Sequence, residues 1–584
     1  MKKLSKKERK FIDENENAKN YIAYDELKLY ANTDIPLSPS KTEINKTLLT
    51  VKDVWADFVP NENIRYETVF DSEKKKTFVI VADNYNGDNL LAETDVYIPS
   101  YDSAKAVILI NEFDRLPQQS VIDALVKKNC FVFVVDYNGI KPDTHTHFPE
   151  EIDYGKFGNE GIHIKEVCPT ARETCQYLYV KILRRCLDFI GLRFPDKELV
   201  AVGIRTGADL AMQLSGTEKK RVSGIACICG AGYSKLIDIP KFGSTLWTPD
   251  NKTLSWITGV SGISYMKNYP NPVFVGIGTN GTISDIDRMG SLRSLIKGKF
   301  TLSVSLQSAD NIDAKTFNMF IMWLDGVYWH SSFPEPPVTT IEINNDGTVY
   351  ANIKATSIPP IKQAYFYYSC DDINHKTRCW KQIAGETVGF AQHLAKLTFN
   401  SNCEHLFYYT EIVYVNGMTV TEELQYINLK KYRLQITPEK YSSILFRHGG
   451  EGHFCEISDD AVIMADGITE EAVPTGAKGS VCKFGSMHIY VASNCKNADS
   501  SRILQVDSFC EKQNYTLELI ATLRGSNVEY RASKKLVSIN TFVDAQFNCT
   551  DFKDEYFRPL TEWKDIAAIT VVNSNIIINK MIFI

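Results

Sequence analysis

Long apolar runs are missing from this 584-residue sequence. Because a membrane-spanning helix needs about 18 or more consecutive apolar residues, none is expected. The basic amino terminus is not followed by an apolar segment, so the sequence also predicts no export signal. We therefore expect a cytoplasmic protein whose 14 scattered cysteines are reduced.

Concentrated positive charge is also missing. The chain has 65 Lys and Arg against 71 Asp and Glu, a net charge of −6, and its one basic run lies in residues 2–10. Because phosphate backbones are bound by concentrated basic surfaces, nucleic acid is excluded as a partner. The 44% of hydrophobic residues is enough for several buried cores, and the length corresponds to about three to five domains.

Apolar strands alternate with helical patterns over residues 61–332. Short continuous apolar runs predict buried strands at 104–110, 130–137, 198–204, 222–231, 271–278 and 300–307, and helical periodicity appears at 118–129, 177–194 and 314–329. This alternation predicts an α/β domain with a mostly parallel sheet and helices on both faces. Residues 1–60 are expected to be a helical or mixed lead-in that packs onto it.

The pattern changes after the proline-rich linker at 334–337. Alternating strands predict an antiparallel, fibronectin-type-like β-sandwich over 333–432, with a hairpin turn at Asn416-Gly417. Further short strands predict a second antiparallel sandwich, jelly-roll-like, over 433–584.

The segment from Gly203 to Gly207 carries most of the functional information. A strand runs into Gly203-Ile204-Arg205-Thr206-Gly207 and then into a helix, which is the pattern of a G-x-S-x-G nucleophile elbow with arginine in place of serine. The glycines required by a tight, strained turn are present, whereas the nucleophile is absent.

Together with four other motifs, this elbow resembles the acetyl-xylan-esterase and cephalosporin-deacetylase branch of the α/β-hydrolase superfamily over residues 45–332. The other motifs are VWADFVP at 54–60, VYIP at 96–99, VDYNG at 135–139 and HTHFPEEIDYGKFGN at 145–159. The resemblance implies an α/β-hydrolase fold with a Ser-Asp-His triad.

The other two triad positions also depart from the family. The acid would lie after strand 271–278, where Thr279-Asn280-Gly281 stands, with Asp285 and Asp287 a few residues late. The base would lie within 308–313, which has no histidine. We therefore predict a degenerate triad with no catalytic residue. Substitute nucleophiles would be Thr206, which points elsewhere on the turn, or Cys168 and Cys175 in a rearranged site.

A permanently charged guanidinium at a helix amino terminus needs a compensating anion. One hypothesis is an internal ion pair of Arg205 with Asp209, one helical turn on, or with Glu112 or Asp114 on the loop after strand 104–110. The other is a pocket that binds a carboxylate, phosphate or acidic sugar. The residues predicted to bind such a ligand are Arg205, Thr206, Glu112, Asp114, His145 and His147.

Three further groups have structural and functional interpretations. His145 and His147, among Asp143, Glu150, Glu151 and Asp153, suggest a pocket rim, a solvated loop or a metal pair. Cys370, His375 and Cys379 suggest a hairpin loop or a zinc site. Tyr556, Phe557 and Trp563 suggest a core cluster or a sugar-stacking platform. We predict neither a metal nor a cofactor.

These observations favour a non-catalytic α/β-hydrolase homologue that binds a carbohydrate-related or anionic small molecule. The alternatives are an active carbohydrate esterase with a non-standard site and a purely structural or interaction protein. No nucleic acid or membrane partner is expected, and the oligomeric state is left open.

Overall fold

The computed structural model describes residues 49–242, 250–331, 333–399, 402–437, 443–449, 453–457, 463–464, 468–482, 486–491, 500–524, 528–538 and 540–584. The predicted lead-in at residues 1–48 therefore lies outside the described residues. Contacts divide the chain into two compact units. Unit 1 comprises Met1–Val275, Arg288–Thr301 and Trp323–Ser331, and unit 2 comprises Gly276–Asp287, Leu302–Met322 and Ser332–Ile584.

A nine-stranded sheet has the order β1-β2-β3-β5-β4-β6-β7-β8-β9. Its strands are β1 Tyr66–Asp71, β2 Lys75–Tyr85, β3 Asp88–Tyr97, β4 Lys105–Ile110, β5 Phe131–Asp136, β6 Glu198–Ile204, β7 Gly224–Ile228, β8 Val273–Gly278 and β9 Phe300–Ser305. The strands from β1 through β3 to β5 pair antiparallel, whereas β5, β4, β6 and β7 pair parallel. Every residue of β7, β8 and β9 is buried, as predicted for strands covered on both faces.

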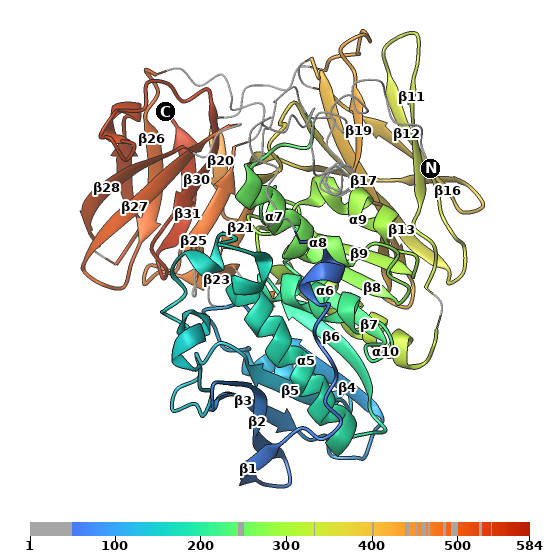
Figure 1. Cartoon of the computed structure of the whole chain (residues 1–584). Helices are drawn as coiled ribbons and strands as arrows, with labels where there is room; N and C mark the ends of the chain where they lie inside the picture. Colours follow the sequence, from blue (N-terminus) through green and yellow to red (C-terminus); the bar gives the residue numbers. More distant parts are fainter. Residues whose placement is uncertain are drawn as a thin grey trace, which may run out of the picture. The chain divides into compact units, whose positions relative to one another are not determined.

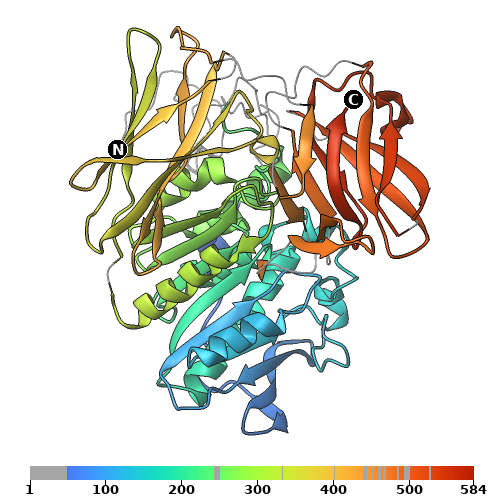
Figure 2. The same cartoon turned by 180° about the vertical axis from the view of Figure 1, so that it is seen from behind.

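Helices cover both faces of this sheet, which confirms the predicted α/β class. They are α4 Gln119–Lys127, α5 Cys175–Arg193, α6 Gly207–Thr217, α7 Asn251–Gly259, α8 Gly262–Tyr265, α9 Met289–Leu295 and α10 Ala314–Tyr328. Figure 1 shows α5 and α6 in front of the sheet, and the reverse view in Figure 2 shows α4 and α10 on its other face.

The described end of the lead-in packs onto this sheet domain. It forms a single helical turn, α3 Val51–Val54. The Trp55 indole stacks on Tyr177 at 4.8 Å between ring centroids, and its Nε1 donates to the Tyr265 hydroxyl at 3.0 Å. None of the helices in the described part of the chain has the length and apolar character that a bilayer crossing needs.

Unit 2 holds two further pairs of antiparallel sheets. In the first pair, β11-β12-β16-β15 faces β14-β13-β17-β18, and β19 also pairs with β17. Their bounds are β11 Val338–Ile343, β12 Val349–Lys354, β13 Ile361–Cys370, β14 Lys381–Ala384, β15 Glu386–Gly389, β16 Gln392–Leu397, β17 His405–Tyr414, β18 Thr419–Thr421 and β19 Gln425–Asn428. The predicted hairpin is confirmed, because Gly417 takes a φ of +84° between β17 and β18.

The second pair comprises β23-β24-β31-β26-β29, with β20 on β31, and β21-β25-β30-β27-β28. The strands are β20 Ile444–Arg447, β21 His453–Ile457, β23 Ile468–Ala472, β24 Lys478–Cys482, β25 Ser486–Tyr490, β26 Leu504–Phe509, β27 Asn514–Leu523, β28 Glu529–Val537, β29 Val543–Phe547, β30 Ile566–Val571 and β31 Ile577–Phe583. A buried apolar cluster that includes Leu519, Phe547 and Ile569 forms its core. Two β-sandwiches therefore follow the α/β domain, as predicted.

Candidate functional site

The corner between β6 and α6 has the backbone of a nucleophile elbow. Arg205 takes a φ of +50°, a left-handed conformation that is unusual for a residue with a long side chain. Its amide donates to the Ile228 carbonyl on β7 at 2.7 Å. The strained corner predicted from the sequence is therefore present, with arginine at its tip.

The glycines of the corner are required by close backbone contacts. A Cβ at Gly207 would lie 2.3 Å from the Asn111 carbonyl oxygen, and one at Gly203 would lie 2.5 Å from the Ala208 Cα. A Cβ at Gly230, after β7, would lie 2.2 Å from the Arg205 carbonyl oxygen. The corner is therefore held between the chain segments that follow β4 and β7.

The Arg205 side chain is buried and paired with a carboxylate. Its NH1 donates to Glu112 Oε1 at 2.9 Å, and the two side chains are only 4% and 10% exposed. Glu112 lies on the loop after β4, and Arg115 Nε is 3.6 Å from the same oxygen. Burial raises the pKa of Glu112, and the Arg205 charge opposes that rise. The predicted internal ion pair is thus formed with Glu112.

The other two predicted partners of Arg205 lie elsewhere. Asp114 is 58% exposed, with Arg115 Nε at 4.0 Å. Asp209 is buried and accepts a hydrogen bond from the Ser234 hydroxyl at 3.3 Å, and burial raises its pKa to about 7. Thr206, the neighbouring hydroxyl, accepts from the Phe113 amide at 3.3 Å. The Thr206 hydroxyl is thus engaged by the loop after β4.

The two histidines of the His-x-His motif are bound to different carboxylates. His145 Nδ1 lies 2.8 Å from Glu93 Oε2, and His147 Nε2 lies 3.1 Å from both carboxylate oxygens of Asp88. Both histidine side chains are more than half exposed. These contacts favour the solvated-loop interpretation over a metal pair.

A cavity of about 190 Å³ opens beside the loop after β4, in unit 1. Its apolar wall includes Leu109, Ile122 and Val134, and its polar lining includes Lys75, Glu93, Asp95, Asn111, Glu112, Arg115, Asp136, Asn138 and Lys141. Of the residues predicted to bind ligand, Glu112 lines this cavity.

Most charges in the cavity lining are neutralised within the protein. Lys141 binds both Glu93 and Asp95, and Lys75 lies 2.9 Å from Asp95. Asp136 accepts hydrogen bonds from the Ile140 amide at 2.9 Å and from the Thr144 hydroxyl. The cavity therefore combines apolar walls with a charge-balanced polar side.

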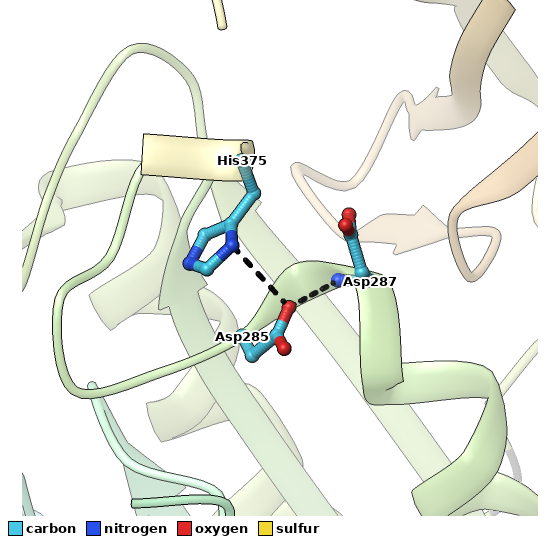
Figure 3. Close-up of side chains that lie close together, drawn as sticks. All are labelled: Asp285, Asp287 and His375. Carbon is cyan, nitrogen blue, oxygen red and sulfur yellow. Dashed lines mark hydrogen bonds and ion pairs between the residues drawn. The ribbon is translucent and has the colours of Figure 1, made fainter. Parts of the chain in front are cut away.

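The two aspartates that follow β8 are bound within unit 2. His375 Nδ1 lies 3.7 Å from Asp285 Oδ1, which also accepts from the Asp287 amide at 2.9 Å (Figure 3). The Arg378 guanidinium binds both carboxylate oxygens of Asp287, with NH2 at 2.9 Å from Oδ2, and both side chains are fully buried. His375 and Arg378 come from the loop between β13 and β14.

Amide side chains after β8 and β9 bind the backbone of the same loop. Asn280 Nδ2 donates to the carbonyl oxygens of His375 and Arg378 at 3.1 and 2.8 Å. Gln307 Oε1 accepts from the Trp380 amide at 2.6 Å. The segments where the resemblance implies an acid and a base are therefore attached to the loop at 371–380.

Asp285, Asp287 and His375 have potential ligand atoms within 4.8 Å of one another. They do not fit a divalent cation, because the Arg378 charge lies on both oxygens of Asp287. His375 Nε2 is also held by the Gly281 carbonyl at 2.9 Å. Because both ring nitrogens of His375 are engaged in this way, His375 does not serve as a zinc ligand with Cys370 and Cys379. We assign the cluster a structural role.

Sequence reasoning missed the contacts of His375 and Arg378. Both lie about 90 residues after the aspartates that they bind, in a segment interpreted as a hairpin loop or zinc site. The available signal was the density of charge in DDINHKTR at 371–378, which is unusual beside buried strands.

The strand order and the corner at Arg205 define an α/β-hydrolase-type domain. Strand β1 is an addition at the edge of the sheet. The other eight strands have the order β2-β3-β5-β4-β6-β7-β8-β9, and the strand-to-helix corner follows β6.

Comparisons with known proteins return structures alone. The chain matches no protein-family model, and no curated protein matches it. It is similar to Est1E of Butyrivibrio proteoclasticus, solved with ferulic acid, at 10% identity over 42% of this chain and 96% of that chain, with a TM-score of 0.31. It is also similar to acetyl xylan esterase 1 of Thermoanaerobacterium sp. JW/SL YS485, at 10% identity over 52% and 98% of the two chains, with a TM-score of 0.35. A thermostable carboxyl esterase of Bacillus coagulans gives 11% identity over 40% and 91%, with a TM-score of 0.28.

The raised pKa of Asp209 predicts a pH-dependent stability. Its carboxyl has a pKa of about 7 in the folded chain and about 3.9 when unfolded, so the proton stabilises the fold below about pH 4. This contribution is lost as the pH rises through about 7. Asp209→Asn should therefore lose less unfolding free energy than the wild type between pH 5 and pH 8, measured by denaturant unfolding. Parallel pH profiles would contradict this, and exposed Asp71→Asn is the control.

Breaking the Asp287–Arg378 pair should destabilise the chain strongly. Arg378→Ala and Asp287→Asn each leave a buried charge without its partner, which costs about 3–5 kcal/mol. We expect a matching loss in the free energy of unfolding by denaturant. Lys564→Ala, which removes an exposed partner of Glu562, should leave it nearly unchanged. Equal effects of the buried and exposed variants would show that the pair is not structural.

Proposed function

We propose that the α/β-hydrolase-type domain is a non-catalytic homologue that binds a carbohydrate-related or anionic small molecule instead of hydrolysing esters. The observation that carries this proposal is the buried ion pair of Arg205 and Glu112 at the nucleophile corner.

The chemistry of the corner supports the loss of hydrolysis. A guanidinium stays protonated at physiological pH, so it serves neither as a nucleophile nor as a general base. Its charge is already balanced by Glu112, and this weakens the case for an anion bound directly to Arg205. The ligand therefore belongs in the neighbouring cavity, which Glu112 lines from its other side.

The unused oxygens of the cavity favour a neutral, hydroxyl-bearing ligand. Within the described residues, Glu112 Oε2 and the side-chain oxygens of Asn111 and Asn138 accept no hydrogen bond, whereas the amide nitrogens of both asparagines donate to backbone carbonyls. Acceptors that receive no hydrogen bond from the described residues suit hydroxyl donors and disfavour an anion. Arg205 and Arg115 beside Glu112 disfavour a cation. A carbohydrate-related ligand is therefore preferred over an anionic one.

Ester hydrolysis is the direct test of the first part of the proposal. Purified full-length chain should release p-nitrophenol from p-nitrophenyl acetate no faster than buffer with denatured protein. Arg205→Ser should also stay at background, because a serine alone lacks a base to accept its proton. A wild-type rate above background that disappears in Arg205→Ala would establish an active esterase and overturn the proposal.

Ligand-observed NMR tests the second part. Saturation transfer from the full chain to a neutral monosaccharide, xylose or glucose, should exceed transfer to the corresponding uronic acid. Asn138→Asp, which replaces an amide by a charged acceptor, should weaken the signal several-fold. Asn416→Asp, an exposed change in the turn between β17 and β18, is the matched control. Stronger transfer to the uronic acid would assign an anionic ligand instead.

A further inference from the structure

An exposed aromatic pair lies on a turn of the last sandwich, in unit 2. Tyr556 and Phe557 stand between the short 3-10 helix Cys549–Asp551 and strand β30. The two side chains are 68% and 81% exposed. Only a minor part of the surface of each residue is therefore buried by the rest of the chain.

Hydrogen bonds hold this turn in one conformation. The Asp554 carboxylate accepts from the Tyr556 amide at 3.0 Å, from the Arg558 amide at 2.8 Å and from Arg558 Nε at 2.7 Å. The Lys553 backbone also bridges to Arg531 and to Pro559. The aromatic pair is therefore presented by a preorganised turn, which lowers the entropy lost on binding.

The predicted third aromatic belongs to the core. Trp563 is 1% exposed, donates from Nε1 to the Arg502 carbonyl at 2.8 Å, and packs edge-on against Phe552 at 5.4 Å. Of the two interpretations given for these aromatics, the core cluster is therefore the one that holds for Trp563. Buried Trp563 and Phe552 instead anchor the base of the turn that carries the other two.

Phe557 has a backbone conformation that is unusual for a residue with a large side chain. The residue takes a φ of +61°, a conformation that glycine or asparagine adopts more readily. A strained residue is normally held by packing around its side chain, whereas this side chain is 81% exposed. The turn is held by hydrogen bonds from the Phe557 amide to the Asp554 carbonyl and from the Asp554 amide to the Arg558 carbonyl, both at 3.0 Å, so the fold does not require the exposed ring.

We propose that Tyr556 and Phe557 form a platform for the face of a pyranose sugar. The C–H face of such a ring is apolar and packs on aromatic rings, and its hydroxyls point sideways towards polar neighbours. Here one such neighbour is Arg558, whose guanidinium carbon lies 5.1 Å from the Tyr556 ring centre.

The charges around the platform favour a neutral sugar over other occupants. Arg531 and Arg558 are paired with Glu529 and Asp554 in the same part of the sandwich. A balanced set of charges provides no attraction for an anionic lipid surface or a nucleic acid. This platform is separate from the cavity of unit 1, and it does not rest on the function proposed for that cavity.

Affinity electrophoresis of the full chain tests the platform. Native gels containing soluble xylan, galactomannan or mixed-linkage β-glucan should retard the wild type in at least one polysaccharide. Tyr556→Ala and Phe557→Ala should each weaken the apparent affinity several-fold, and the double variant should lose retardation. If none of the polysaccharides retards the wild type, the proposal is overturned.

Matched variants separate binding from folding. Phe557→Gly removes the ring and suits the φ of the turn, so it should lose retardation without lowering the melting temperature. Phe390→Ala removes an aromatic that is 88% exposed elsewhere and should leave retardation unchanged. Equal loss in Phe390→Ala overturns the proposal. So does cosedimentation of the wild type, but not the double variant, with phosphatidylcholine and phosphatidylserine vesicles.

Discussion

A guanidinium charge at the β6–α6 corner is the constraint on which the α/β-hydrolase-type domain depends. Arg205 cannot lose its proton, and it is 96% withdrawn from water, so the loop after β4 must supply a carboxylate. Glu112 does so, and its position fixes the loop against the corner. The same loop contributes part of the cavity wall. One ion pair thereby links the backbone of the corner to the shape of the neighbouring cavity.

Unit 2 applies the same principle at the carboxyl ends of β8 and β9. Asp287 and Arg378 are both fully buried, and the guanidinium also donates to the Asp372 and Ile373 carbonyls at 2.8 and 3.0 Å. Asp372 in turn binds Arg524 of the last sandwich at 2.6 Å. The charges of Asp287, Arg378 and Asp372 are therefore all bound by contacts within the chain.

The sequence allowed the fold class to be predicted because local patterns determine it. Continuous apolar runs identified the buried strands, and the glycines of 203–207 identified a corner whose geometry depends on close backbone contacts. The site was predictable only in part. Glu112 was one of several carboxylates considered for Arg205, and sequence separation alone could not select it over Asp209. The contacts of His375 and Arg378 could not be predicted, because residues about 90 positions apart that touch in the fold leave no pattern in the local sequence.

The two buried ion pairs, Arg205–Glu112 and Asp287–Arg378, constrain how the chain tolerates substitution. A serine at position 205 would remove the nearer of the two cations beside Glu112, and freeing an acid after β8 would remove the carboxylate that binds Arg378. Each of these single substitutions thus alters the charge balance around a buried group. A serine-hydrolase site at this corner would therefore require several replacements together.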